Sequence, residues 1–325
     1  MKATAKAHTN IALIKYWGKR DESLILPTNS SLSLTLDGFY TTTTVDFREG
    51  LMQDRFLLDD QPVEGDAYHR VTQFLNLIRR LAGREELYAN VRSINAVPTA
   101  AGLASSASGF AALAAAGTKA IGLELNDQEL SRLTRQGSGS ASRSIYGGFS
   151  EWQMGSKVDG SDSFAVPIAS AEHWDVRVAA VVLSSRVKKV SSRAGMKRTV
   201  DTSPFYPGWI DGISKDLREI KAAIHTKDFE KTGQIAEANC LKMHATTLAA
   251  NPPFTYWNDL TMRVMQTVQE MRANGIPVYF TIDAGPNVKV LYLPEHEKSV
   301  EKTLREIPGV ADVILSKPGQ GISYL

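Results

Sequence analysis

The segment at residues 98–117 has residue types that suit binding of a phosphate chain. Its first half is a turn of glycines and hydroxyl side chains, and its second half is rich in alanine, which favours helix. The first N–H groups of a helix lack intrahelical acceptors and carry partial positive charge, so such a junction attracts anions. Gly102 has no Cβ to hold a triphosphate away from the main chain, and Ser105, Ser106 and Ser108 add hydroxyl donors. A serine-capped, buried alanine-rich helix would have the same pattern.

A second serine- and glycine-rich cluster, at residues 136–148, also leads into a short predicted helix. Ser138 and Ser140 offer hydroxyl groups at its start. The planar guanidinium of Arg143 could bind a diphosphate or a carboxylate through two parallel hydrogen bonds. The alternative is that Arg143 only caps neighbouring carbonyl groups.

Two lysines four residues apart, Lys15 and Lys19, flank Tyr16, Trp17 and a glycine. On a helix or in a tight loop this spacing directs both amines to one face. Surface lysines are ordinary, but two large aromatic side chains beside a glycine are costly to expose. The pattern therefore favours a lined pocket.

The candidate acid–base group is Asp283, which follows an apolar strand and precedes an Ala-Gly-Pro turn. Aspartate is common in such turns. A carboxylate at the end of a rigid strand could also accept a hydroxyl proton during phosphoryl transfer. Lys188 and Arg193, in a basic stretch near the middle of the chain, could close over phosphates or could simply be solvated.

Composition and charge narrow the function classes. With 325 residues and 43% hydrophobic content, the chain can bury two medium cores. The 37 basic and 35 acidic residues give a formal net charge of +2, so we expect neither nucleic-acid nor membrane binding. A single cysteine, Cys240, and no apolar run of signal-peptide or membrane-spanning type favour a cytoplasmic protein. The histidines show no metal-ligand spacing, so any Mg²⁺ should arrive with a nucleotide.

Periodicity and turn signals predict the elements that position these residues in the first half. Alternating leucines at 32–36 continue past residues 37–38 (Asp-Gly) into a threonine-rich run, which indicates a β-hairpin. An amphipathic helix follows, and residues 87–95 form the strand that leads into the first serine-rich turn. Asn126, with Glu129 three residues later, predicts a helix with a capping box.

The second half is predicted to begin with helices and to end with strands and one more helix. We expect the apolar run at 176–183 to be the last strand of the first domain, because a polar, basic stretch follows it. Helices are expected at 212–225, 229–249, 256–274 and 297–307, and strands at 278–282, 288–293 and 313–315. This order predicts two domains, 1–184 and 185–325, the second of them α+β with antiparallel pairing.

Five segments occur in order along nearly the whole chain: 15–21 (KYWGKRD), 26–33 (LPTNSSLS), 102–109 (GLASSASG), 136–144 (QGSGSASRS) and 281–287 (TIDAGPN). Together they closely resemble the mevalonate diphosphate decarboxylase family, within the superfamily of galactokinase, homoserine kinase, mevalonate kinase and phosphomevalonate kinase. One serine- and glycine-rich loop would be a weak signal. The combination is highly specific.

The resemblance implies both a fold and a reaction. The fold would be α+β, with an ATP-binding domain like the second domain of ribosomal protein S5, a ferredoxin-like C-terminal domain, and the site in the cleft between them. ATP, with Mg²⁺, and (R)-5-diphosphomevalonate would give isopentenyl diphosphate, CO₂, ADP and phosphate, a step of isoprenoid biosynthesis. Phosphorylation turns the 3-hydroxyl into a leaving group, and the positive charge that builds at C3 is relieved as CO₂ departs. A homodimer is also implied.

The resemblance further implies roles for single residues. Asp283 would orient or deprotonate the 3-hydroxyl, Arg143 with Asn10 would hold the substrate carboxylate, and Lys19 would complete the catalytic set. The diphosphate tail and carbon skeleton would contact Tyr16, Lys19, Ser138, Ser140, either Ser192 or Ser191, Arg193 and Met196. The nucleotide would contact Gly102, Ser105, Ser106, Ser108 and Lys188 at its phosphates, and Ser93 and Asn95 at adenine. No protein ligand for the metal is assigned.

Two other functions stay open at this point. A small-molecule kinase of the same superfamily would use the same loop and stop at the phosphorylated alcohol, although such kinases usually carry GLGSS where residues 102–106 read GLASS. A nucleotide-binding regulator could keep the fold without turnover. It would gain nothing from having both Asp283 and Arg143.

Overall fold

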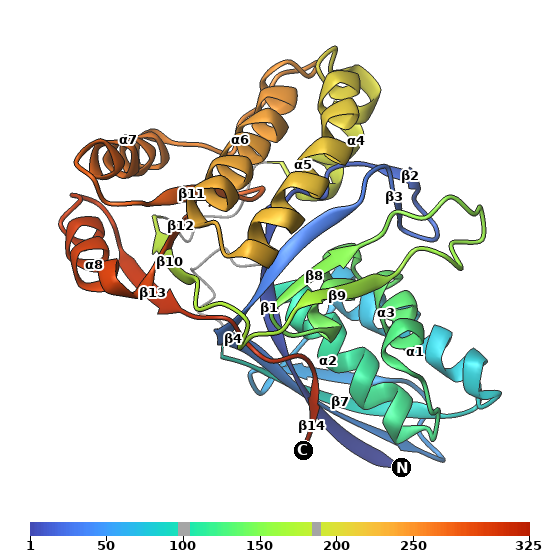
Figure 1. The fold of residues 1–325 in the computed structure, drawn as a ribbon. Coiled ribbons are helices and arrows are strands. Elements are labelled where there is room, and N and C mark those ends of the chain that lie inside the picture. The colour runs from blue at the N-terminus through green and yellow to red at the C-terminus, as the bar shows by residue number, and fades with distance from the viewer. Residues whose placement is uncertain (97–104, 184–189) are drawn as a thin grey trace.

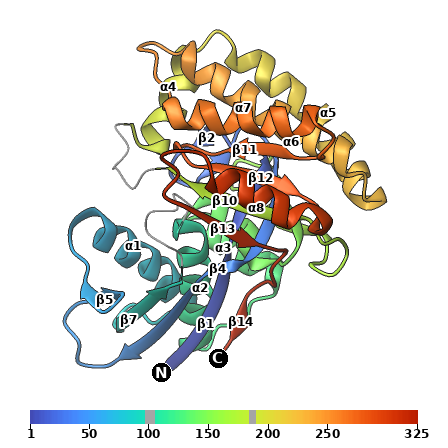
Figure 2. The same ribbon diagram turned by 90° about the vertical axis from the view of Figure 1, so that its left-hand side faces the viewer.

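The computed structural model describes residues 1–96, 105–183 and 190–325, and Figure 1 shows them in two parts that meet beside β1 and β4. Each part is a sheet covered by helices, which confirms the predicted α+β class. Both termini lie at the same end of the molecule (Figures 1 and 2), because the last strand pairs antiparallel with the first through Ala5 and Tyr324. Within these residues, no helix is both long and apolar enough to cross a bilayer.

The first part is built on a sheet with the strand order β14-β1-β4-β7-β5-β6, to which β8 and β9 are attached beside β4. Its strands are β1 (Lys2–Ile14), β4 (Ser31–Arg48), β5 (Arg55–Leu58), β6 (Gln61–Pro62), β7 (Tyr88–Asn95), β8 (Phe149–Trp152), β9 (Ala165–Ala169) and β14 (Ser323–Tyr324). The helical elements are α1 (Gly65–Ala82), α2 (Ser105–Ala120), α3 (Asp127–Arg135) and the 3₁₀ helix η2 (Gly139–Ile145). A separate ribbon pairs β2 (Lys19–Asp21) with β3 (Leu26–Pro27).

The second part contains an antiparallel sheet with the order β11-β12-β10-β13. Its strands are β10 (Arg177–Val182), β11 (Tyr279–Ile282), β12 (Val288–Tyr292) and β13 (Asp312–Ser316). Its helices are α4 (Ser192–Thr202), α5 (Tyr206–Thr226), α6 (Phe229–Leu248), α7 (Asp259–Ala273) and α8 (Glu297–Arg305), with a 3₁₀ turn, η3 (Pro294–His296), before the last. The predicted antiparallel pairing is confirmed.

Several local predictions are confirmed because short-range signals decide them. Val71, Phe74, Leu75 and Ile78 form the buried side of α1, as their helical spacing requires. The capping box before α3 is present, with the Asn126 side chain accepting from the Glu129 N–H at 2.9 Å.

The predicted hairpin near residue 38 is wrong, because β4 is one continuous strand of 18 residues. Asp37 and Gly38 lie at an irregularity in the β1–β4 register rather than in a turn. Their polar groups bind the C-terminal segment: the Asp37 N–H donates to Lys317 O at 2.9 Å, and Ser316 Oγ donates to Asp37 Oδ1 at 2.9 Å. A distant segment thus satisfies the groups that a turn would satisfy locally.

The strand at 176–183 exists, but it belongs to the second sheet, whereas the sequence predicted it as the last strand of the first domain. β10 lies between β12 and β13 in the second sheet, where Val178 pairs with Leu291 and with Ser316. A buried apolar strand has the same sequence pattern in either sheet, because periodicity does not identify its partners. The basic stretch that follows also ends in a helix, α4, that was not predicted.

A shared hydrophobic core joins the two parts. Leu34 and Phe39 of β4 pack in one cluster with Trp209 of α5, Met243 of α6 and Val178 of β10, all of them buried. The other face of the second sheet packs against α7 and α8 in a cluster of its own. The two parts therefore meet through close-packed apolar surface, which holds the groups at their junction in fixed positions.

A buried ion pair supports the first part. Arg79 of α1 donates to both carboxylate oxygens of Asp54 at 2.8 and 3.1 Å, and the Ala89 N–H donates to the same carboxylate at 2.8 Å. We expect Arg79→Met to lower the free energy of unfolding by about 3–5 kcal/mol, because it leaves the Asp54 charge buried without its main partner. Urea unfolding measures this loss.

Arg84→Met is the matched control, since Arg84 pairs with Glu86 in an exposed ion pair. Such pairs contribute less than about 1 kcal/mol. Equal losses in the two variants would contradict the expectation.

Candidate active site

A cavity of about 520 Å³ lies where the two parts of the molecule meet. Its walls come from the end of β1 and the loop after it, α1, the start of α2, η2, α4 and the turn after β11. The predicted site residues among its lining are Asn10, Tyr16, Lys19, Ser106, Ser138, Ser140, Arg143, Ser192, Arg193, Met196 and Asp283. Segments distant in sequence thus converge as predicted.

Asp283 sits in the turn after β11, and its carboxylate is held by two lysines. Lys15 Nζ lies 2.7 Å from Oδ1, and Lys289 Nζ lies 3.3 Å from Oδ2. Both lysine side chains are only 2% exposed, whereas the Asp283 side chain is 34% exposed toward the cavity. Burial alone would raise the pKa of Asp283, but the two ammonium groups hold it well below its usual range. The carboxylate is therefore ionised and fixed in orientation.

Arg143 is a buried cation without a carboxylate partner among the described residues. Its Nη1 donates to Ser31 Oγ at 2.6 Å, and its Nε and Nη2 donate to Asn10 Oδ1 at 3.3 and 3.2 Å. The Asn10 amide is in turn fixed by donating to Ser140 O and Ser144 Oγ. Burial lowers the pKa of Arg143 to about 10, so the guanidinium is still charged near neutral pH. Such a group favours an anionic ligand.

The loop after β1 packs Tyr16 beside η2 and against Trp152 of β8. The Tyr16 ring meets the Trp152 ring edge to face at a centroid distance of 4.7 Å, and its buried hydroxyl has no hydrogen-bond partner in the described structure. Gly139 lets η2 approach the Trp152 ring closely, because a Cβ at this position would lie 2.7 Å from that ring. The predicted aromatic-lined pocket is therefore present, with Trp17 also in its wall.

The glycine of the Lys15–Lys19 loop is required by conformation and by space. Gly18 has a φ of +117°, and a Cβ on it would lie 1.9 Å from the Tyr206 hydroxyl of α5. That hydroxyl donates to Trp17 O at 3.0 Å. The contact ties the loop to the second part of the molecule.

Further cationic and hydroxyl groups line the cavity. Lys19 lines the cavity and forms an ion pair with the exposed Glu22. Ser191 caps α4, its Oγ accepting from the Ala194 N–H at 3.2 Å, and Ser192 is the first residue of the helix. Both serines line the cavity, so both stay candidates for the same hydroxyl role.

The predicted nucleotide ligands divide into three groups. Ser106 in the first turn of α2 lines the cavity, whereas Ser108 turns inward, where its hydroxyl bonds to Thr9 and Thr41 at 3.1 and 2.8 Å. Ser93 bonds to a neighbouring strand and Asn95 accepts from Thr41 Oγ1, and neither lines the cavity. Gly102 and Lys188 lie outside the described residues, and Ser105 is described only as the first residue of α2.

Three residues of the cavity lining, and Lys289 beside Asp283, received no role from the sequence. Lys15 was predicted only to share a lined pocket with Lys19, and Asp66 and Arg70 of α1 gave no signal. Burial lowers the pKa of Arg70, and the nearby positive charge of Arg193 lowers it further. A usable signal existed for Lys289, because a lysine inside the apolar strand sequence VKVLY is unusual unless it is paired.

Metal binding leaves little trace in the protein itself. Within residues 1–96, 105–183 and 190–325, no three His, Cys, Asp or Glu side chains are grouped so that they could hold an ion. Mg²⁺ commonly keeps several waters and binds through substrate phosphates with one or two carboxylates. Two carboxylates, those of Asp66 and Asp283, are in the cavity lining.

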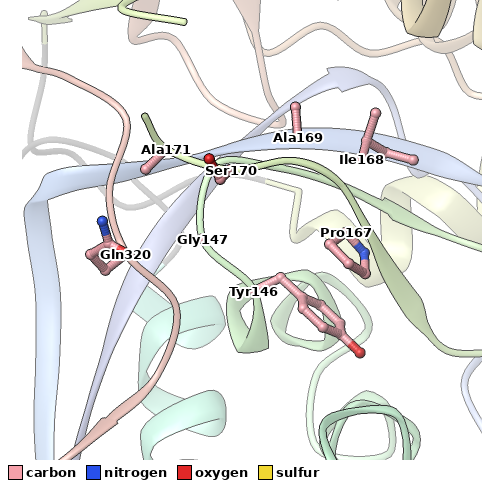
Figure 3. A pocket seen from close by; sticks show the side chains of 8 residues that line it. All are labelled: Tyr146, Gly147, Pro167, Ile168, Ala169, Ser170, Ala171 and Gln320. Atoms are coloured by element: carbon pink, nitrogen blue, oxygen red, sulfur yellow. The ribbon is translucent and has the colours of Figure 1, made fainter. Parts of the chain in front are cut away.

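A second cavity, of about 400 Å³, lies away from these groups (Figure 3). Its lining residues are Tyr146, Gly147, Pro167, Ile168, Ala169, Ser170, Ala171 and Gln320. No charged side chain is among them, and none is a predicted site residue. The chemistry therefore belongs to the first cavity.

Comparisons with known proteins agree with this geometry. Residues 7–165 match the family model of the diphosphomevalonate decarboxylase-like N-terminal domain, and residues 178–318 match that of the mevalonate 5-diphosphate decarboxylase C-terminal domain. The diphosphomevalonate decarboxylase of Ganoderma lucidum is 42% identical over 320 residues, covering 92% of this chain and 80% of that protein.

Solved structures are also similar. Mevalonate diphosphate decarboxylase from Staphylococcus aureus has a TM-score of 0.95 at 48% identity, covering 100% of this chain and 98% of the other. A structure described as "MDDEF in complex with MVAPP, AMPPCP and Magnesium" has a TM-score of 0.94 at 49% identity, covering 100% and 99%.

Proposed function

This chain belongs to the diphosphomevalonate decarboxylase family, and from that premise we propose how its cavity decarboxylates mevalonate 5-diphosphate with ATP. One observation carries the proposal: the ionised carboxylate of Asp283, the buried guanidinium of Arg143 and the phosphate-loop residue Ser106 line a single cavity. These are an acceptor for a hydroxyl, a cation for a carboxylate and a donor for a phosphate. ATP and Mg²⁺ are the cofactors, as in the related magnesium complex.

Asp283 orients the 3-hydroxyl for attack on the terminal phosphorus. Two lysine ammonium groups stabilise its negative charge, which makes it a weak base but a well-placed hydrogen-bond acceptor. A loose phosphoryl-transfer transition state develops little need for early proton removal, so orientation contributes most. The hydroxyl proton passes to the Asp283 carboxylate late in the step, as the new O–P bond forms and the bond between the terminal phosphorus and ADP breaks.

Arg143 holds the carboxylate that is lost as CO₂. Because Asn10 and Ser31 fix the guanidinium from behind, it can align the breaking C–C bond with the empty orbital that forms at C3 as phosphate departs. Lys19, Arg193, Ser138, Ser140, Ser192, Tyr16 and Met196 would then contact the diphosphate tail and carbon skeleton, with Arg70 adding a further cation.

The nucleotide is proposed to lie at the start of α2. Ser105 and Ser106 would meet its phosphates together with main-chain N–H groups of the first turn of the helix, and Gly102 and Lys188 stay predicted ligands. Ser108 is not retained, because its hydroxyl is buried and bonded to Thr9 and Thr41. Mg²⁺, when bound, screens phosphate charge.

Domain boundary, assembly and compartment are further proposals. Since β10 belongs to the second sheet, we place the boundary between β9 and β10 rather than after residue 184. A homodimer is supported by the family resemblance. A cytoplasmic location is supported by the single cysteine, Cys240.

The stoichiometry of products tests the proposal. With diphosphorylated mevalonate, we expect one CO₂ for each ADP, because phosphorylation only prepares the alcohol to leave. Coupled ADP detection with trapping of labelled CO₂ measures the ratio, and monophosphorylated mevalonate is the control substrate. ADP without CO₂ would instead indicate a kinase.

A further inference from the structure

Lys289 lies behind Asp283, on the side away from the cavity. It is on β12, opposite Thr281 of β11, in the register that places their side chains on the same face of the sheet. Its neighbours Val288 and Val290 point into the cluster under α7 and α8, whereas Leu291 points to the junction of the two parts. Lys289 therefore points toward the junction, as the two-residue period of a strand requires.

The environment of Lys289 explains why a buried ammonium is tolerated there. Its Nζ lies 3.3 Å from Asp283 Oδ2 and donates to Asn287 O at 3.3 Å. An unpaired buried ammonium would be strongly destabilising. Lys15 contacts the other carboxylate oxygen, so the two ammonium groups and one carboxylate leave one net positive charge.

We propose that Lys289 is a positioning residue for decarboxylation, which holds the Asp283 carboxylate from behind so that it stays ionised and aimed at the substrate hydroxyl. The inference rests on the proposed role of Asp283. Lys289 does not line the cavity, so it acts only through Asp283, whereas Lys15 lines the cavity itself.

Other groups near Asp283 do not titrate in a way that would hide this effect. Burial lowers the pKa of His244 to about 3 and raises that of Cys240, so both α6 side chains are neutral near neutral pH. Arg143 of η2 stays charged. Burial lowers the pKa of Lys289 and the negative charge of Asp283 opposes this shift, so the charges that face the carboxylate are those of Lys15, Lys289 and Arg143.

Lys289→Met tests the proposal, because methionine keeps the unbranched shape of the side chain as far as Cε and removes the charged ammonium group. We expect kcat to fall on the order of 10²-fold, as for a misplaced reacting group, with KM for both substrates little changed. Lys289→Arg should restore most of kcat.

A direct measurement follows the carboxyl group. In enzyme labelled with ¹³C at aspartate carboxyls, with Asp283 assigned from Asp283→Asn, the wild-type signal should stay at its ionised position down to the lowest pH at which the protein is folded. In Lys289→Met the signal should begin to titrate at higher pH, because one group that lowers its pKa is gone. Val290→Ala, on the opposite face of the same strand, should lose stability without moving this titration.

A thermal-unfolding comparison covers the case in which Lys289→Met does not fold. Asp283→Asn leaves two buried lysines without a counterion, so adding Lys289→Met to it should raise the melting temperature. A fall would overturn the proposal. The proposal would also be overturned if Lys289→Met kept both the wild-type kcat and the wild-type titration of the Asp283 carboxyl while Asp283→Asn was inactive. Full activity of Asp283→Asn would instead refute the proposed role of Asp283.

Discussion

Asp283→Asn should abolish turnover while leaving ATP binding largely intact. Asparagine has the same shape, but its amide cannot carry the charge that accepts and orients the 3-hydroxyl. Groups of this kind typically contribute on the order of 10²- to 10⁴-fold to the rate. Coupled ADP release measures kcat, and titration with a fluorescent ATP analogue measures nucleotide affinity.

Asp60→Asn is the matched control for this experiment, because Asp60 forms an exposed ion pair with Arg92 and neither residue is in the cavity lining. It should turn over like the wild type. Near-normal activity in Asp283→Asn would remove the carboxylate from the mechanism, however well placed it is in the cavity.

Arg143→Gln should lower both substrate affinity and turnover. Glutamine removes the charge and the planar fork that would hold the substrate carboxylate, and it leaves the oxygens of Asn10 and Ser31 without their donor. Loss of a buried charged hydrogen-bonding partner costs about 2–5 kcal/mol, which here should appear in kcat/KM. Steady-state kinetics with varied mevalonate diphosphate measures the change.

Arg92→Gln controls for the loss of one arginine, since Arg92 is exposed and paired only with Asp60 in the described structure. Thermal unfolding separates a folding defect from a binding defect. A kinetic profile like that of the wild type in Arg143→Gln would exclude this guanidinium from the site.

Local sequence patterns predicted much of the fold. The apolar side of α1 and the capping box of α3 depend on residues three or four positions apart, so the local sequence is enough to predict both features. The position of β10 in the second sheet and the continuity of β4 depend on partners far along the chain. Periodicity alone could not identify these partners.

The candidate site, like the fold, was predictable from the sequence only in part. The motifs around Lys19, Ser106, Arg143 and Asp283 indicated which residues would converge, and the cavity contains them. The side-chain directions were not predictable: Ser108 belongs to the same serine-rich motif as Ser106, yet it bonds inward to the sheet. A hydroxyl motif does not show which of its members faces a ligand.

By itself, the sequence determined the chemical groups, the local elements and the family of this protein, because these follow from residue types and short-range backbone preferences. Only the tertiary structure decided which charged side chains contact one another. Lys15 and Asp283 lie 268 residues apart, and Lys289 reaches the same carboxylate from a neighbouring strand. Such contacts arise when packing of the shared core brings β1 against β11 and β12, and the charge and orientation of Asp283 follow from that packing.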